Sequence, residues 1–466
     1  MGFTLPEWTS VTDDCYIKKK VHPFLSRHHI LLNIIAFTCG FVIYFSMYAY
    51  RKGFTAADYR NIKLLGLSYK MMLVILQLAG YILSKFCGIV IISSLDKTKR
   101  AFMLVALIGF AEISLILFGI TKVPYNAFWM FFNGLPLGLI WGLVFSYLEG
   151  RRTSELLGSG MCISFIISSA IIKTIAKEFI SMGYSDFWVP AIVGAIFYPI
   201  LCLFTFFIEL VPPPDEEDIK SRTERVAMTH EDRVNFIKSF WPGLTAMIIF
   251  YMLICGLRDF RDNFMRELFT AMGETESFVF TKSELIVAVI IIIPVILLMF
   301  VKNHLMGFFL YHVVIAIGFG LLLFAAVLYE DKLISGVTWM IVVGAAIYIG
   351  FVPYSSFIFD RQIAAFKVKA NSGFLVYIAD SLGYATAIIF MLLKEFGTKA
   401  NWLGFFKICS YFVSIAGIAL QMVSLVYYYY KSKSMLHIAN ENAQEILLDE
   451  APSHETHEDV MLMEEE

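Results

Sequence analysis

Two arginines, Arg51 and Arg258, each stand at the end of a long apolar segment of the chain. Each closes a set of three residues, spaced by four and then three positions, that share one helical face: Tyr44, Tyr48 and Arg51, and Tyr251, Cys255 and Arg258. A guanidinium presents a planar fork of N–H donors that suits the oxygens of a phosphate group. Two arginines that face the same cleft would therefore form a binding site for a dianion.

Each arginine also has a simpler explanation. Arg51 could extend to a membrane interface, and Arg258 could pair with Asp259 or Asp262. Burying an arginine in a membrane costs about 2.5–3.5 kcal/mol on insertion scales, so a buried arginine without a role is uncommon. The repeated tyrosine-to-arginine spacing favours a shared site over two unrelated interface residues.

A third cation, Lys85, lies well inside the second apolar segment. The sequence QLAGYILSKFCG places it on the same side of a helix as Gln77 and Ser84. The alternative is a lysine that reaches to the interface, beside glycines that allow close helix packing. We predict that Lys85 faces the ligand. Four tyrosines that share a face with these cations are predicted to donate their hydroxyls to the same ligand: Tyr44, Tyr48, Tyr81 and Tyr251.

Three other ionisable residues lie within apolar segments: Glu112, Lys173 and Asp380. Charged groups at such positions are functional candidates by default. An acid among them could pair with a cation of the cleft, or take up a proton if cotransport occurs. Alternatively, each belongs to a structural ion pair inside the helix bundle.

The composition indicates a polytopic membrane protein and excludes a soluble enzyme. Of 466 residues, 58% are hydrophobic and 16% are charged, and the mean hydropathy is +0.71. The net charge of −2 gives no indication of nucleic-acid binding. The chain contains no GxxxxGKS/T loop, no HExxH and no CxxC motif, so we expect no enzymatic activity, no cofactor and no metal.

Apolar runs predict about twelve transmembrane helices. Each run is long enough, at 1.5 Å per residue, to cross about 30 Å of hydrocarbon. The spans are expected near residues 30–50, 66–94, 101–121, 125–147, 157–180, 187–210, 240–261, 279–301, 304–328, 334–356, 371–395 and 404–430. The predicted fold class is an all-α polytopic membrane protein.

A charged cytoplasmic linker, residues 211–239, divides these spans into two halves of six. We expect a cytoplasmic N-terminal segment at 1–29, six-helix halves at 30–210 and 240–430, and an acidic, disordered or weakly helical tail at 431–466. Two such halves joined by a charged linker are typical of the major facilitator fold. Related halves would place Arg51 and Arg258 at matching depths, facing the cleft between them.

Lysines and arginines concentrate in the loops that are cytoplasmic if the N-terminus is cytoplasmic. Both termini are therefore expected in the cytoplasm, with the protein in the plasma (cytoplasmic or inner) membrane. The first external loop departs from this rule because it carries four basic residues: Arg51, Lys52, Arg60 and Lys63. A binding site for an anion would explain that exception.

The sequence YAYRKGFTAADY, followed by LGLSYKMMLVILQLAGYILSKFCG, resembles the opening of the organophosphate:phosphate antiporters. This major facilitator family includes the glycerol-3-phosphate and hexose-6-phosphate transporters. YILSKFCG keeps Tyr81, Ser84, Lys85 and Phe86 of the family's second span, with Ile82 in place of a glycine. FFNGLPLGLIWGLVFSYLEGRRTSE is similar to the family's fourth span, and LICGLRDF to the seventh-span segment that bears its second arginine.

The resemblance implies that Arg51 and Arg258 clamp a phosphoryl group, with Lys85 as an auxiliary cation, while the halves rock around the site. Two features depart from the family pattern. The fifth span, GSGMCISFIISSAIIKTIAK, has serines and Lys173 where glycerol-phosphate members have a histidine. The loop ISSLDKTKRAF, with Asp96 and Arg100, is a degraded form of the superfamily's Gly-x-x-x-Asp-Arg gating signature.

We therefore predict a monomeric secondary transporter that exchanges an organic phosphate, or another organic anion, for inorganic phosphate. Its partners would be the small anionic substrate, inorganic phosphate and the lipid bilayer, with no nucleic acid. Two alternatives stay open. One is a proton-coupled symporter of another small anion or sugar, which would need Glu112 or Asp380 to titrate. The other is a membrane sensor that binds a sugar phosphate without transporting it.

Overall fold

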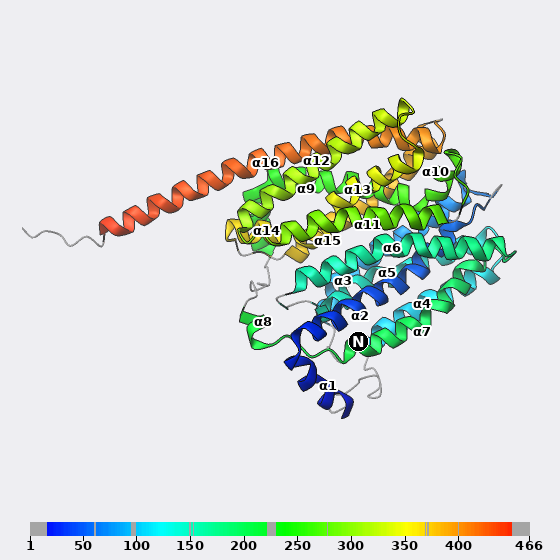
Figure 1. The fold of residues 1–466 in the computed structure, drawn as a ribbon, viewed down its shortest axis with the longest axis horizontal. Coiled ribbons are helices and arrows are strands. Elements are labelled where there is room, and N and C mark those ends of the chain that lie inside the picture. Colours follow the sequence, from blue (N-terminus) through cyan, green and yellow to red (C-terminus); the bar gives the residue numbers. More distant parts are fainter. Residues whose placement is uncertain are drawn as a thin grey trace, which may run out of the picture.

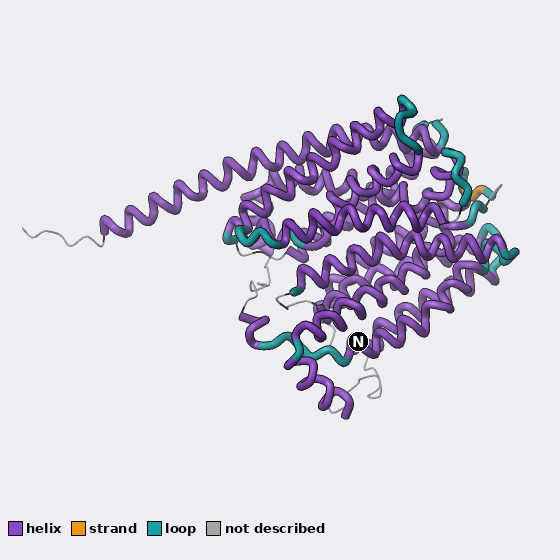
Figure 2. Tube along the Cα trace, in the orientation of Figure 1, coloured by secondary structure: helices purple, strands orange, loops and turns teal. Residues whose placement is uncertain are grey.

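The computed structural model describes residues 16–59, 62–94, 99–148, 151, 153–220, 230–276, 278–368, 370, 372–398 and 400–449. Helices account for nearly all of this part of the chain (Figure 1; Figure 2). Strands β1 (Lys63–Leu64) and β2 (Leu67–Ser68) pair antiparallel in one short hairpin. Within the described ranges, twelve helices are long and apolar enough to cross a membrane. The prediction of an all-α polytopic fold is confirmed.

Each half contains six long helices. The N-terminal half comprises α2 (His29–Lys52), α3 (Tyr69–Ser94), α4 (Arg100–Ile120), α5 (Phe128–Leu148), α6 (Ser154–Ser181) and α7 (Val189–Glu209). The C-terminal half comprises α9 (His230–Asn263), α11 (Phe278–Met299), α12 (His304–Glu330), α13 (Gly336–Ser356), α15 (Ser372–Leu392) and α16 (Trp402–Asp449). Shorter elements are α1 (Tyr16–Arg27), α8 (Glu216–Lys220), α10 (Met265–Ala271), α14 (Ile358–Phe366), 3-10 turns at Gly53–Ala56 and Tyr125–Ala127, and a π turn at Leu393–Gly397.

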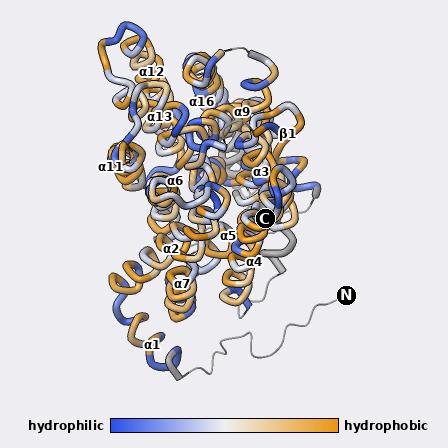
Figure 3. The backbone as a smooth tube through the Cα atoms, turned by 90° about the vertical axis from the view of Figure 1, so that its right-hand side faces the viewer, coloured by the Kyte–Doolittle hydropathy of each residue, from blue (hydrophilic) through white to orange (hydrophobic). Residues whose placement is uncertain are grey.

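Hydrophobic residues run along the long helices, whereas hydrophilic residues gather in the connecting turns, and α1 carries both kinds (Figure 3). The halves contact each other mainly through two helix pairs, α3 on α15 and α6 on α11. We call the end of the bundle that carries residues 63–68 the hairpin end, and the opposite end, where α2 begins, the His29 end (Figure 2). Both arginine-bearing helices, α2 and α9, run from the His29 end to the hairpin end.

Three segments differ from what the sequence led us to expect. A helix, α1, forms within the expected N-terminal segment, and α9 begins at His230, inside the expected linker. The helix α16 continues to Asp449, through the part of the tail expected to be disordered or weakly helical (Figure 1). Extending an existing helix avoids the cost of nucleation, and the tail sequence ENAQEILLD is rich in residues that favour helix. These two effects explain why polarity alone did not end α16.

Glycine sets the distance between α3 and α5. A Cβ atom at Gly134 of α5 would lie 2.0 Å from the backbone oxygen of Gln77 in α3. Only a residue without a side chain lets two helix backbones approach so closely. Because α3 also carries Tyr81 and Lys85, this contact helps to fix the position of both side chains.

The variant Gly134→Ala should therefore lower the thermal unfolding midpoint of the purified protein, because the added methyl group forces α3 and α5 apart. The matched control is Gly320→Ala in α12, where nothing lies within 4 Å of the added Cβ. Alanine favours helix over glycine by about 1 kcal/mol, so the control should be as stable as the wild type or slightly more stable. Equal midpoints for Gly134→Ala and the wild type would contradict this packing argument.

Candidate functional site

Arg51 and Arg258 meet in one small cavity between the halves. Its lining residues come from α2, α6, α9 and α13: Tyr48, Arg51, Lys52, Phe165, Arg258, Asp259, Asp262 and Tyr348. The space in which the centre of a water molecule fits is about 10 Å³, which is close to the minimum for one water. An organic anion could therefore enter only after the halves move apart. The structure shows the site in a closed arrangement.

Arg51 is held by aromatic rings. It lies in the last turn of α2, where the partial negative charge of a helix C-terminus favours a cation, and its side chain is buried. The guanidinium carbon lies 4.5 Å from the centre of the Tyr81 ring, 5.5 Å from that of Tyr384 and 5.7 Å from that of Tyr48. Cation–π contacts of this kind stabilise a guanidinium without cancelling its charge. Arg51 thus keeps its donors for an anion.

Arg258 has a carboxylate partner as well as ring contacts. Its Nη2 and Nε atoms donate to Oδ1 of Asp259 at 2.9 and 3.2 Å. Its guanidinium carbon lies 3.9 Å from the centre of the Phe351 ring and 5.5 Å from that of Tyr384. The Asp259 pairing that offered a simpler explanation is thus present, and Arg258 lines the cavity nevertheless. Tyr384 of α15 lies at the same distance from both guanidinium carbons.

Lys85 is paired across the two halves. Its Nζ lies 2.9 Å from Oδ2 of Asp380, so an ion pair links α3 to α15. Tyr251 of α9 donates its hydroxyl to Oδ1 of the same carboxylate at 2.5 Å. The structure thus brings three predicted site residues together, with Lys85 bound to protein rather than pointing at an open cleft. Asp380, Lys85 and Tyr251 are all buried.

Asp262 binds two lysines from the opposite half. Its Oδ2 lies 2.6 Å from Nζ of Lys52, and its Oδ1 accepts from Lys173 and, at 2.5 Å, from Ser169. Lys52 also donates to Oδ1 of Asn263 at 2.6 Å. Lys52 belongs to α2 and Lys173 to α6, whereas Asp262 belongs to α9. One carboxylate therefore ties the C-terminal half to two helices of the N-terminal half.

The central charges do not cancel. The cations are Arg51, Lys52, Lys85, Lys173 and Arg258, and the anions are Asp259, Asp262 and Asp380; all eight are buried. Five cations and three carboxylates leave an excess of two positive charges among these residues. Burying uncompensated charge is expensive, so an excess of this size favours the binding of a dianion.

Further contacts close the hairpin end. Lys70, at the start of α3, lies 2.6 Å from Glu267 of α10, and Arg266 lies 2.9 Å from Asp58. Thr174 of α6 and Thr281 of α11 share a hydrogen bond at 2.9 Å. All of these contacts cross between the halves. Access to the cavity from the hairpin end is therefore blocked by several layers of polar contacts.

Of the predicted site residues, Tyr48, Arg51 and Arg258 line the cavity. Tyr81, Lys85, Lys173, Tyr251 and Asp380 take part in the ring contacts, ion pairs and hydrogen bonds described above, whereas Tyr44 and Glu112 take part in none of these. Tyr44 is buried one layer behind it, with its ring edge-on to Tyr48 at 5.7 Å and to Trp141 at 5.1 Å between centres. Glu112 lies inside the N-terminal half, against Gly194 of α7, and its Oε2 has no hydrogen-bond partner. It does not pair with a cation of the site. Parts of two sequences that carry the family resemblance lie outside the described residues: Asp96 and Lys97 in ISSLDKTKRAF, and Glu149 and Arg152 at the end of FFNGLPLGLIWGLVFSYLEGRRTSE.

Sequence reasoning missed several residues of the site, mainly aromatic ones: Phe165, Tyr348, Phe351 and Tyr384. No charge marks these residues, and aromatic side chains are common throughout the chain. Two charged residues were noted in the sequence but not assigned to the site, Lys52 as a loop cation and Asp262 as a possible partner of Arg258. Lys52 directly follows Arg51, and Asp262 lies four residues after Arg258 on the same face of α9.

The model of a family of unknown function, DUF5690, matches residues 53–431, most of the chain. The chain belongs to this family. Lys85, Arg258, Asp262 and Asp380 fall within the matched region of this DUF5690 protein, and Arg51 lies just before it. No curated protein matches the chain.

Solved structures with a similar fold belong to several kinds of transporter. A D-xylose–proton symporter is 14% identical, with a TM-score of 0.55 over 84% of this chain and 96% of that one. A POT family transporter in complex with a thioalcohol-conjugated peptide is 16% identical, with a TM-score of 0.57 over 85% and 96% of the two chains. The nucleoside transporter NupG is 14% identical, with a TM-score of 0.54 over 86% and 98%. The DUF5690 protein therefore has the major facilitator fold and is an integral membrane protein, with twelve candidate spans among its described residues.

Removing the carboxylate of Asp262 should open the hairpin end. In Asp262→Asn, Lys52 and Lys173 would lose their shared anion, and breaking a buried ion pair costs about 3–5 kcal/mol. We expect a Thr281→Cys reporter, in a background whose native cysteines are replaced by alanine, to react at least about tenfold faster with a thiol reagent in nanodiscs.

The matched control is Glu284→Gln. It removes a buried carboxylate that lies 2.5 Å from Arg261 within the C-terminal half. This variant should be less stable without faster labelling, because its ion pair does not cross between the halves. Unchanged labelling in Asp262→Asn, or equal acceleration in both variants, would show that Asp262 does not hold the hairpin end closed.

Proposed function

We propose that this protein is a secondary transporter that exchanges an organic phosphate for inorganic phosphate by alternating access. One observation carries the proposal: Arg51 and Arg258, from different halves of a major facilitator fold, line the same buried cavity, whose neighbourhood has an excess of two positive charges. A phosphate monoester or inorganic phosphate near neutral pH supplies up to two negative charges. Binding such an anion neutralises the site and holds the halves together.

The donors at the cavity suit a tetrahedral oxyanion. A guanidinium offers two parallel N–H donors to two oxygens. Because three rings hold the guanidinium of Arg51 in place, that side chain loses little conformational entropy when it binds an anion. Tyr48 adds a hydroxyl on the cavity wall. Hydrogen bonds to charged groups contribute about 1.5–3 kcal/mol each. The bonds that two guanidinium groups make to an anion would therefore contribute more free energy than is lost when Arg258 leaves Asp259.

The organic part of the substrate would lie against aromatic rings. Ser164 and Ser168 of the fifth span donate to the backbone oxygens of Phe41 and Phe165, at 2.7 and 3.3 Å, and Ser169 binds Asp262. These serines are therefore occupied by protein groups. Phe165 and Tyr348 remain on the cavity wall beside the arginines. They favour a compact substrate with an apolar or ring-shaped face.

Alternating access follows from the way the halves are joined. An anion bound between Arg51 and Arg258 is contacted from both halves, as Asp262 is contacted by Lys52 and Lys173. Opening the hairpin end requires those ion pairs to break, and the anion compensates the cations that are released. Transport without a bound anion would leave like charges facing one another, so exchange is favoured over unidirectional flux.

A second candidate is proton-coupled transport of another small anion or sugar, and the Asp380 site favours it. This buried carboxylate joins Lys85 of α3 and Tyr251 of α9, so a proton on Asp380 would weaken a contact between the halves. Such a carrier would be sensitive to an uncoupler and indifferent to phosphate on the opposite side. These two responses distinguish it from the exchanger.

Phosphate self-exchange in proteoliposomes tests the proposal. Vesicles loaded with unlabelled phosphate should take up labelled phosphate, and a panel of sugar and glycerol phosphates should compete. Arg51→Lys and Arg258→Lys should each slow exchange by about 10–100-fold, because lysine lacks the second donor of the fork. The control Arg233→Lys changes an exposed arginine in the same helix as Arg258 and should leave exchange unchanged.

Near-normal exchange by either Arg51→Lys or Arg258→Lys would remove that residue from the site. If the folded wild-type protein shows no exchange, two outcomes remain informative. Uptake that collapses with an uncoupler would support the proton-coupled carrier. Saturable binding of a sugar phosphate without any flux would instead point to a sensor.

A further inference from the structure

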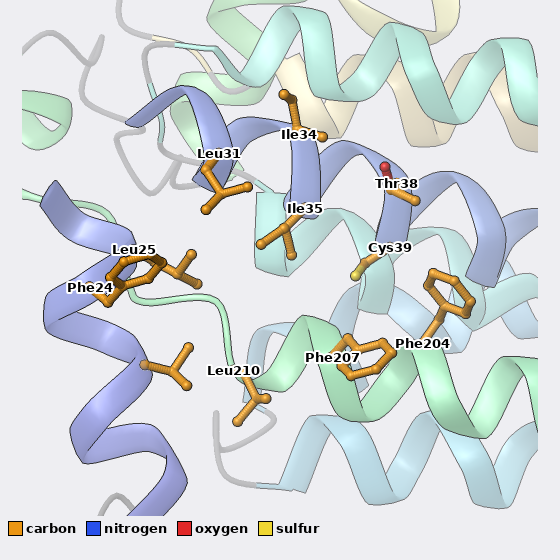
Figure 4. Close-up of a pocket in the computed structure, with 11 residues that line it drawn as sticks. Phe24, Leu25, Leu31, Ile34, Ile35, Thr38, Cys39, Phe204, Phe207 and Leu210 are labelled. Atoms are coloured by element: carbon orange, nitrogen blue, oxygen red, sulfur yellow. The ribbon is translucent and has the colours of Figure 1, made fainter. Parts of the chain in front are cut away.

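A large apolar pocket lies at the His29 end, apart from the central cavity. It is a partly open pocket between α1, the first turns of α2 and the last turns of α7, and its volume is about 490 Å³ (Figure 4). The walls are almost entirely apolar, with Phe24 and Leu25 on one side and Ile35, Phe204 and Phe207 on the other. The last pocket-lining residue of α2 is Cys39 and the first cavity-lining residue is Tyr48, about 14 Å apart along the helix at 1.5 Å per residue, so this pocket and the cavity are separate sites.

The helix α1 is fixed to the bundle by a buried ion pair. Nζ of Lys18 lies 2.7 Å from Oε1 of Glu209, at the end of α7. The hydroxyl of Tyr147, at the end of α5, donates to the other oxygen of Glu209 at 2.7 Å. Because Lys18 is buried, this contact holds α1 at a set distance from α2 and α7. The pocket is therefore a built feature of the fold rather than a gap beside a loose segment.

Basic residues lie along α1 and at its junction with α2. Lys19, Lys20, Arg27, His28 and His29 are exposed; Lys19 and Lys20 lie near the start of α1, and Arg27 and His29 stand where α1 ends and α2 begins. The start of a membrane-spanning helix lies at the level of the lipid headgroups. In α1, Lys19, Lys20 and Arg27 lie on one face, and Val21 and Leu25 lie on the opposite face. A short helix with basic residues on one face and apolar residues on another lies in the membrane interface. Clusters of lysine and arginine at this level attract anionic lipids.

We propose that α1, α2 and α7 form a binding site for one anionic phospholipid, with an acyl chain in the apolar pocket and the phosphate beside the cations of α1. The volume of about 490 Å³ suits a flexible hydrocarbon chain, and the walls offer almost no polar group to a small hydrophilic ligand. The basic residues select an anionic headgroup over a zwitterionic one. This inference is independent of what the central cavity binds.

Retention of defined lipids tests the site. The full-length protein is reconstituted in vesicles of equal parts phosphatidylglycerol and phosphatidylcholine, extracted in detergent and examined by native mass spectrometry. We expect the wild type to retain one phosphatidylglycerol in preference to phosphatidylcholine. The triple variant Lys19→Gln, Lys20→Gln and Arg27→Gln should lower that preference by about tenfold or more. Ile35→Trp, which fills the pocket, should lower the retention of both lipids.

The matched control removes three exposed lysines elsewhere: Lys122→Gln, Lys282→Gln and Lys332→Gln. It should keep the wild-type preference. If the triple variant at α1 does not fold, the salt dependence of the wild type tests the headgroup selection instead, because high salt should weaken its preference for phosphatidylglycerol. Equal retention of both lipids by the wild type would overturn the headgroup selection. Full retention by folded Ile35→Trp would overturn the placement of the acyl chain.

Discussion

A charge inside a membrane must be compensated, and the contact between the two halves of this protein is arranged around that requirement. Lys85 has Asp380, and Lys52 and Lys173 share Asp262. Each of these pairs joins a residue of one half to a residue of the other. The electrostatic compensation that makes the buried charges tolerable thus also holds the two halves together. Arg51, by contrast, is stabilised by rings that leave its charge in place.

The buried ion pairs are of two kinds, those within one half and those between the halves. Arg261 and Glu284, 2.5 Å apart within the C-terminal half, form a pair that need not change when the halves move. In the proposed transport cycle, the pairs between the halves would break and re-form instead, and a ligand that contacts both arginines would act only on these pairs. The fold thus keeps the charges that stabilise one half apart from the charges that link the two halves.

The sequence was sufficient for the architecture, since apolar runs of sufficient length predict spans, and a charged linker predicts two halves. The repeated spacing also predicted that Arg51 and Arg258 face one cleft, and both line the same cavity; that they bind a ligand stays a prediction. The sequence could not assign partners: whether Lys85 faces a ligand or Asp380 depends on how α3 packs on α15, more than 290 positions apart along the chain. Tyr384, between the arginines, carries no charge or motif that would distinguish it from other tyrosines.

The helix α1 was missed for a different reason. Its sequence, YIKKKVHPFLSR, is too polar to suggest a membrane span and too short to show a clear helical repeat of apolar residues. Its position depends on Lys18 reaching Glu209, a contact between residues 191 positions apart. Local pattern could suggest a basic segment there, but only the folded chain turns that segment into one wall of a pocket.

The excess of two positive charges at the central site also connects it to the membrane potential. Moving one elementary charge through the full field costs or releases about 2.3 kcal/mol per 100 mV. An empty site that changes the side to which it opens would carry its excess charge through part of that field, whereas a site neutralised by a dianion would carry none. The membrane potential would thus act mainly on the empty protein. It would oppose the empty site's change of side in one direction, whereas the exchange of one dianion for another would move no net charge across the membrane.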